Sequence, residues 1–369
     1  MKILFLAFPH ADLYKEIVKE MERKGHEVIV ILDRLLRYDP YHCSSKLKSI
    51  KKFIFVDTYN IYNHYWNKMI ATDARLSESY DLFLALSGVS VGERLIRHLE
   101  TLNPHIKKVL YTWDNCTYYA FDRMLPWFDR SYTFDVEDVK ANSEWKLLPI
   151  YCKAPAHNET QPNLYDIFSI GTNHGDRLSY FYRILPQLKV KGLSYYIKII
   201  ELQTTLSWKQ QLKYHILKAV GNKKNEAYLH RIEFICDKED KYGIKQNSYI
   251  AQNKYDELIS QSRCVLDDQR STQSGLTAKF MWALANRKKI ITTNKINQII
   301  FGIKWAYEYE FVSPKQVLIV NKNNPVILED FIKYPIAEDE FSDVSSYYID
   351  RWVDELLSVV MDKRDVNKL

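Results

Sequence analysis

Residues 263–294 constrain the fold of this chain most strongly, because a strand, a loop, a helix and a second strand follow one another within them. Residues 264–266 form a short apolar run that predicts a buried strand, and residues 290–293 are expected to form the next strand. Between them, apolar residues recur at helical spacing over residues 276–286, and the basic residues that follow suit a helix C-terminus. Two strands joined through a helix are the repeating unit of a parallel sheet.

The loop of this segment ends at the start of its helix, where backbone N–H groups lack partners and attract anions. Ser274, Gly275 and Thr277 place a small residue, a glycine and a hydroxyl there. Lys279 lies in the first turn, where a cation opposes the helix dipole unless an anion binds beside it. The pattern fits a diphosphate site, and it also fits an ordinary capped helix with a surface lysine.

At about 150 residues per domain, a chain of 369 residues suggests two domains. The net charge of +6 allows an anionic ligand or a membrane surface but requires neither, and no nucleic-acid partner is expected. Five scattered cysteines without a metal-binding spacing indicate reduced thiols and a cytoplasmic protein. No apolar run reaches the ~18 residues of a membrane span, and the N-terminus lacks the pattern of a signal peptide.

Residues 1–33 begin the chain with a strand, an amphipathic helix and a strand, which make a β-α-β unit. A stretch with three prolines and no periodicity, residues 148–162, separates this half from a second β-α-β unit at residues 166–200. Further strands are expected at residues 53–56, 80–86, 108–113, 131–134, 232–236 and 317–320, and helices at residues 92–102, 249–262 and 347–361.

A basic, partly helical insertion is expected at residues 203–225. One face of this helix would carry Trp208, Leu212, His215, Ile216 and Ala219. The pattern indicates either a solvated or interfacial helix or a patch for a membrane or an anionic glycan.

Polar residues follow several predicted strands, and ligands of parallel sheets bind at the carboxyl ends of strands. His10, Asp114 and Asp135 take such positions in the first half. In the second half, Gly171 belongs to a turn that lets the backbone approach a ligand closely. The turn is not a GxGxxG fingerprint, and no acidic residue is clearly placed for a dinucleotide ribose, so NAD is not expected.

The stretch VLDDQRSTQSGLTAKFMWALANRKKIITTN resembles a C-terminal segment of bacterial capsule and lipopolysaccharide biosynthesis proteins of GT-B architecture. LYTWDN, TFDVEDV, DIFSIGT with Arg177, and YYIDRW are similar to that family as well. Ser274 stands for the family's Thr, and Trp282 stands where related enzymes usually have a Glu that holds the donor ribose. The central positions that match are Asp267, Gln269, Gln273, Gly275, Leu276, Thr277, Lys279, Ala283 and Leu284.

The resemblance implies an α/β protein with two Rossmann-like domains facing a cleft, closed by a C-terminal helix. Residues 1–150 would form the acceptor-side domain, residues 151–165 a linker, residues 166–345 the nucleotide-sugar domain and residues 346–369 the closing helix. The donor diphosphate would lie at Gly275–Thr277. The implied donor-site residues are Gly171, Thr172, Arg177, Asp267, Gln269, Gln273, Ser274, Gly275, Leu276, Thr277 and Lys279.

The implied activity is transfer of a sugar from a nucleotide-sugar to a glycan or lipid-linked glycan acceptor of a growing surface polysaccharide. No DxD motif stands where a metal-dependent transferase would place one, so neither a metal nor a cofactor is expected. An inverting transfer needs a base near the acceptor hydroxyl. Asp114 is the first candidate, followed by His10 and Asp135, although Asp114 also fits an Asx turn.

Two alternatives stay open. The fold also suits a sugar-nucleotide epimerase, which needs acid and base groups facing the donor sugar itself. Trp282 in place of Glu favours a non-catalytic protein that binds a nucleotide-sugar or a glycan. The expected location is the cytoplasm, with room for a peripheral contact at the inner face of the membrane.

Overall fold

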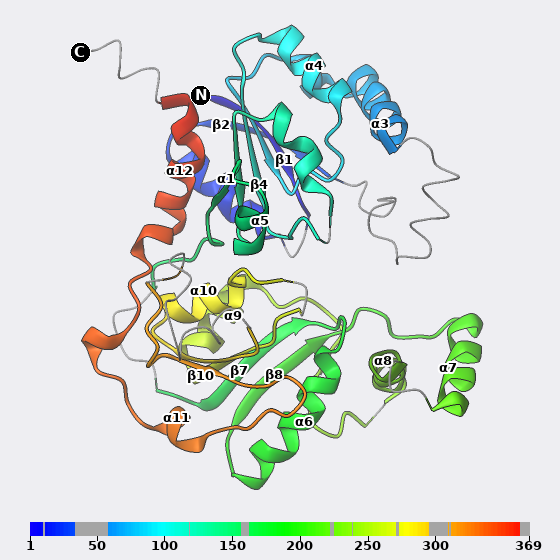
Figure 1. The fold of residues 1–369 in the computed structure, drawn as a ribbon, viewed down its shortest axis with the longest axis vertical. Coiled ribbons are helices and arrows are strands. Elements are labelled where there is room, and N and C mark those ends of the chain that lie inside the picture. Colours follow the sequence, from blue (N-terminus) through cyan, green and yellow to red (C-terminus); the bar gives the residue numbers. More distant parts are fainter. Residues whose placement is uncertain are drawn as a thin grey trace. The chain divides into compact units, whose positions relative to one another are not determined.

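The computed structural model describes residues 1–9, 12–33, 58–117, 119–155, 162–221, 225–237, 239–270, 273–294, 309 and 311–361. The chain divides into two compact units (Figure 1). The first unit comprises residues 1–151, 272–276 and 346–369. The second comprises residues 152–271 and 277–345.

The first unit contains a parallel sheet of six strands in its described part, in the order β2-β1-β3-β4-β5-β6. After Lys2, strand β1 is apolar and buried, as expected for a strand that helices cover on both faces. The elements are β1 (Lys2–Ala7), α1 (Tyr14–Arg23), β2 (Glu27–Leu32), α3 (Thr58–Thr72), η3 (Ala74–Ser77), β3 (Leu82–Leu86), α4 (Glu93–Leu102), β4 (Lys107–Thr112), η4 (Phe121–Trp127), β5 (Arg130–Thr133), α5 (Val136–Ala141) and β6 (Trp145–Leu147).

The C-terminal helix α12 (Ile349–Met361) also belongs to the first unit. Apolar residues recur at helical spacing along one face of α12, and they belong to the same core cluster as residues of β1 and β4. Trp352 is the largest side chain of that face, and its indole N–H donates to the Pro149 carbonyl oxygen at 3.0 Å. The helix expected at residues 347–361 is therefore confirmed, and it completes the core of the unit that begins the chain.

The second unit contains another parallel sheet of six described strands, in the order β12-β11-β10-β7-β8-β9. The pairing of β10 with β11 confirms the parallel unit predicted for residues 263–294. The elements are β7 (Tyr165–Thr172), α6 (Arg177–Val190), β8 (Tyr195–Ile200), α7 (Trp208–Val220), α8 (Glu226–Cys236), β9 (Lys245–Gln246), α9 (Gln252–Ser260), β10 (Ser262–Asp267), α10 (Ala278–Ala285), β11 (Lys289–Thr292), β12 (Val317–Ile319), α11 (Glu329–Lys333) and η8 (Glu338–Glu340); η9 (Ser345–Tyr347) precedes α12.

Two expectations for the second unit are wrong. The strand expected at residues 232–236 is the end of helix α8. The apolar alternation there covers only a few residues, and a short run of this kind suits a strand or one buried helix face equally well. Helix α10 begins at Ala278 rather than at Leu276, because Thr277 is its N-cap. The strand expected at residues 53–56 lies outside the described residues.

Candidate functional site

Asp267, the last residue of β10, connects three elements of the second unit. Its carboxylate accepts hydrogen bonds from the Thr277 hydroxyl at 2.7 Å and the Thr292 hydroxyl at 3.0 Å. Thr277 in turn accepts the Phe280 N–H and so begins α10. Burial raises the pKa of Asp267 above its ordinary value. The structure therefore places Asp267 and Thr277 beneath the start of α10, where they determine its position.

Asp268 lies at the centre of a buried ion cluster at the same edge of the sheet. Its Oδ2 accepts a hydrogen bond from Arg177 Nε at 2.7 Å, and its Oδ1 lies 3.7 Å from Lys279 Nζ. Burial raises the pKa of Asp268, but Arg177 and Lys279 together hold it below its ordinary value. The cation in the first turn of α10 thus has an anion beside it, and that anion belongs to the protein.

Lys279 points into the unit rather than toward solvent. Its ammonium group donates to the Ser169 hydroxyl at 3.0 Å and to the Leu266 carbonyl oxygen at 3.2 Å. Only 9% of the residue is exposed, and burial lowers the pKa of its ammonium group. Lys279 can therefore contribute to an anion site through its charge, while its hydrogen bonds go to the protein.

The Arg177 guanidinium covers the turn after β7. It donates to the Thr172 carbonyl oxygen at 2.6 Å, and a Cβ added to Gly171 would overlap the guanidinium. Gly171 is therefore a glycine because an arginine approaches its backbone closely. The structure brings the predicted residues Gly171, Thr172, Arg177, Asp267 and Lys279 together at the carboxyl ends of β7 and β10.

Three further basic residues at this edge were not among the predicted site residues: His174, Arg270 and Lys322. Lys322 follows β12, donates to the Gln269 carbonyl oxygen at 2.9 Å and pairs with Asp176 at 2.6 Å. Burial of the imidazole, and then the positive charges of Arg177 and Arg270, lower the pKa of His174 to about 2. The imidazole is therefore neutral at pH 7. Lys322 could have been found by asking which cations follow each predicted strand.

Gln269 and Trp282 both contact other elements of the second unit. Gln269 is buried, and its backbone N–H donates to the Thr293 hydroxyl at 2.9 Å. The Trp282 ring packs edge-on against Tyr255 of α9, with 5.1 Å between the ring centroids. Trp282 thus joins α9 to α10.

In the first unit, Asp135 follows β5 and is completely buried. Its carboxylate accepts the Glu137 N–H as the N-cap of α5, the Asn115 side-chain amide at 3.1 Å and the Ser274 N–H at 2.9 Å. The Ser274 hydroxyl donates to it as well. With this many donors on one buried carboxylate, Asp135 has the geometry of a structural anchor.

Gly275 lies against the backbone of Phe134, the residue before Asp135. A Cβ at position 275 would overlap the Phe134 carbonyl oxygen and ring, so only glycine fits. Leu276 beside it is fully buried. Residues 273–276 are therefore held at the carboxyl end of β5 by close packing as well as by hydrogen bonds.

Asp114 lies beyond the carboxyl end of β4 and is half-buried. Its Oδ1 accepts the Gln273 side-chain amide at 3.0 Å. The structure thus brings together Asp114, Asp135, Gln273 and Ser274 at one edge of the first sheet. His10, the remaining acid–base candidate, lies outside the described residues.

Asp138 is a buried carboxylate that the sequence reasoning missed. It accepts the Thr133 hydroxyl at 2.9 Å and the Cys116 N–H at 3.0 Å. Burial raises its pKa to about 6, while these hydrogen bonds oppose the rise. Asp138 thus joins Cys116, in the segment after β4, to β5 and α5.

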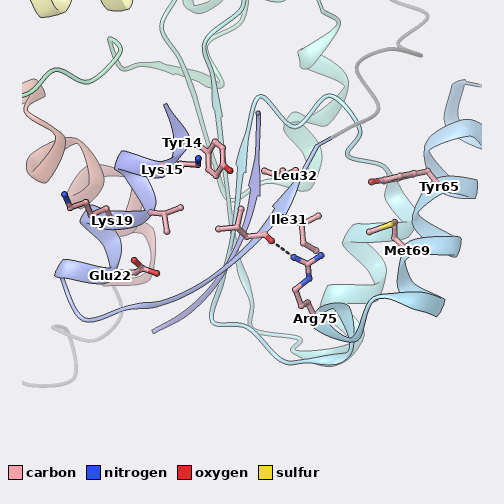
Figure 2. Close-up of a pocket in the computed structure, with 11 residues that line it drawn as sticks. Tyr14, Lys15, Lys19, Glu22, Ile31, Leu32, Tyr65, Met69 and Arg75 are labelled. Atoms are coloured by element: carbon pink, nitrogen blue, oxygen red, sulfur yellow. Dashed lines mark hydrogen bonds between the residues drawn. The ribbon is translucent and has the colours of Figure 1, made fainter. Parts of the chain in front are cut away.

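A pocket of about 670 Å³ lies along the edge strand β2 of the first unit (Figure 2). Side chains from α1, β2 and α3 line it, together with Arg75, whose guanidinium donates to the Val30 carbonyl oxygen at 2.6 Å. Among the predicted site residues that the structure describes, none lines this pocket.

Within the described residues, no group of three or more His, Cys, Asp and Glu side chains could hold a metal ion. The same part of the chain has no helix that is long and apolar enough to cross a membrane. Both findings concern the described ranges alone.

No protein-family model and no curated protein sequence matches this chain. Solved structures do match it. A UDP-forming α,α-trehalose-phosphate synthase from Burkholderia vietnamiensis has a TM-score of 0.57 at 10% identity, covering 100% of this chain and 99% of that one. The trehalose-6-phosphate synthase OtsA has a TM-score of 0.53 at 11% identity, covering 98% of each chain. The chain therefore has the α/β fold of GT-B structures, with two six-stranded parallel sheets in its described part.

Proposed function

We propose that this chain is a metal-independent glycosyltransferase. It transfers a sugar from a nucleotide-sugar to the glycan or lipid-linked glycan acceptor of a capsule or lipopolysaccharide. The observation that carries the proposal is the cationic carboxyl edge of the second sheet at the start of α10, in a chain with the GT-B fold. The second unit would bind the donor, and the first would bind the acceptor.

The electrostatics of the second unit support a diphosphate ligand. The charges of Arg177, Lys279 and Lys322 act on Asp268 and help to lower its pKa. Arg177, Arg270 and Lys322 likewise help to lower the pKa of His174. The backbone N–H groups of the first turn of α10 add a helix dipole of the same sign. A site with these features stabilises a nucleoside diphosphate leaving group through preorganised charges and dipoles.

Asp114 is the proposed general base of an inverting transfer. Unlike the buried Asp135, it is half-exposed, and it lies beyond a strand end, where acceptors of parallel sheets can reach it. Gln273 donates to its Oδ1 and so orients the carboxylate. The base would take the proton of the acceptor hydroxyl as that oxygen attacks the sugar, while the nucleoside diphosphate leaves.

One observation favours a second candidate function, non-catalytic binding of a nucleotide-sugar. Trp282 packs against Tyr255 at the position where the related enzymes hold the donor ribose. A chain that retained the cationic edge and lost the ribose contact could bind a donor without transferring it.

The test is sugar transfer by the full chain, measured as nucleoside diphosphate release with a matched nucleotide-sugar and a lipid-linked glycan. The Asp114→Asn variant should bind donor with unchanged affinity and lose at least 100-fold in transfer rate, the usual scale for a general base. Added EDTA should leave the wild-type rate unchanged. Full activity of Asp114→Asn excludes Asp114 as the base.

If the wild type binds a donor but does not transfer its sugar, the function is non-catalytic binding of a nucleotide-sugar. Isomerisation of the sugar nucleotide without an acceptor would select an epimerase.

A further inference from the structure

Helix α7 of the second unit contacts the rest of that unit through one narrow face. Its half-buried residues are Gln210, Tyr214 and Leu217, which recur at helical spacing and face α8. The Tyr214 hydroxyl donates to Glu233 of α8 at 3.0 Å. No residue of α7 is buried, and the helix lies beyond α8 from the sheet (Figure 1). No described residue of the unit buries the rest of its circumference.

The opposite face of α7 carries a continuous apolar stripe. Trp208, Leu212, Ile216 and Val220 follow one another at four-residue intervals and are 68%, 53%, 54% and 64% exposed. Thirteen residues of helix extend about 20 Å at 1.5 Å per residue. Exposed apolar side chains usually occur singly, so four of them in one exposed row indicate an interaction surface.

The charges beside the stripe identify the partner's chemistry. Helix α7 contains Lys209, Lys213 and Lys218 and no acidic residue. Lys209 lies over the Trp208 ring at 5.6 Å, next to the stripe. Lys218 pairs with Glu233, and Lys213 lies over the Tyr228 ring of α8 at 4.3 Å. Neither Lys209 nor Lys213 has an acidic partner among the ion pairs of the described residues. The stripe is thus bordered by positive charge, as in helices that lie at an anionic lipid surface.

We infer that α7 docks on an anionic bilayer, with the stripe inserted among the acyl chains and Lys209 and Lys213 at the lipid headgroups. A second copy of this helix would place lysines against lysines. A sugar polymer would not require four aliphatic and aromatic side chains in a row. A lipid surface satisfies both the apolar stripe and the positive charge. The inference is independent of the proposed donor site.

The test is co-sedimentation of the full chain with vesicles of phosphatidylcholine, with and without phosphatidylglycerol. We expect binding that requires phosphatidylglycerol and weakens with salt. The double variant Leu212→Glu/Ile216→Glu should abolish binding. The double variant Lys209→Gln/Lys213→Gln should weaken it by tenfold or more, because each lysine near an anionic surface contributes roughly fivefold.

The matched control is Val190→Glu, which changes an apolar residue that is 87% exposed at the end of α6. It should bind vesicles as the wild type does. Brominated lipids should quench tryptophan fluorescence in the wild type and less in Trp208→Phe. Vesicle binding that survives Leu212→Glu/Ile216→Glu would overturn the inference. The inference would also be overturned if the chain self-associates in solution without lipid and Leu212→Glu/Ile216→Glu abolishes that self-association.

Discussion

At the scale of single residues, the basic side chains that the sequence assigned to phosphate binding are held first by the protein's own carboxylate. Arg177 and Lys279 both reach Asp268, and the pattern of residue types in one loop contained no sign of this. Lys279 lies in the first turn of α10, as the motif predicted. The motif could not predict the direction of the Lys279 side chain, because that direction depends on Ser169, a residue more than a hundred positions away.

Replacing Asp268 with Asn should destabilise the second unit by about 3–5 kcal/mol, the range seen when one partner of a buried ion pair is removed. The physical reason is that Arg177 and Lys279 then lie buried without their anion. Urea denaturation measures the change. The control is Asp176→Asn, which removes the half-exposed partner of Lys322 and should change stability by less than about 1 kcal/mol. If the two variants lose equal unfolding free energy, the buried ion pairs of Asp268 do not stabilise the second unit as proposed.

The buried carboxyl of Asp138 should give stability a specific pH dependence. Its pKa is about 6 in the folded chain against an ordinary value of 3.8, so the folded state keeps a proton that the unfolded state has lost between these values. Its contribution to stability therefore falls as pH rises from about 4 to about 6. The difference in unfolding free energy between the wild type and Asp138→Asn, measured across pH 4–7, should change in favour of the variant over this window. A difference that does not vary with pH would disprove the raised pKa.

At the scale of elements, the strands and helices with a clear period were predictable from the sequence, and the exceptions have local causes. The β-α-β openings of both halves and the closing helix are confirmed. Residues 232–236 were misassigned because their alternation is too short to distinguish a strand from a helix face. The close approach of Gly275 to Phe134 was not predictable, because a glycine in a loop does not show what approaches it.

The start of α10 should depend on the Thr277 hydroxyl, which accepts from Phe280 and donates to Asp267. Thr277→Ala removes an N-cap and leaves a buried carboxylate oxygen without its donor, so we expect a loss of about 2 kcal/mol in unfolding free energy. Thr277→Ser keeps the hydroxyl and should retain most of the stability. If Ser and Ala are equally destabilising, the hydroxyl is not what holds the helix start.

At the scale of the whole molecule, the order of elements along the chain predicted two parallel α/β units, and the structural matches show the GT-B fold. The sequence did not predict which unit receives the last helix, since an amphipathic helix pairs with any apolar surface of suitable shape. In the structure, Trp352 of α12 packs against Tyr111 and Tyr151 of the first unit, with centroid distances of 4.7 Å and 5.5 Å.

Trp352→Ala should destabilise the first unit by about 3–5 kcal/mol through loss of a buried aromatic side chain. Hydrogen exchange should locate the effect: amides of β1 and β4 should exchange faster, while those of β7 and β8 should not change. Arg351→Ala, on the exposed side of the same helix, is the control and should have little effect. Faster exchange throughout both sheets would show that α12 does not act on the first unit alone.

The second unit is proposed to bind a nucleoside diphosphate at its cationic edge, and calorimetric titration of the full chain with UDP, GDP, CDP, dTDP and ADP measures this binding. We predict that one of these ligands binds and that Lys322→Gln weakens the affinity by tenfold or more. Lys315→Gln, which changes an exposed lysine before the opposite end of β12, should leave the affinity unchanged. The proposed site would be contradicted if the folded chain binds none of the five ligands. It would also be contradicted if the wild type and Lys322→Gln bind the ligand with equal affinity.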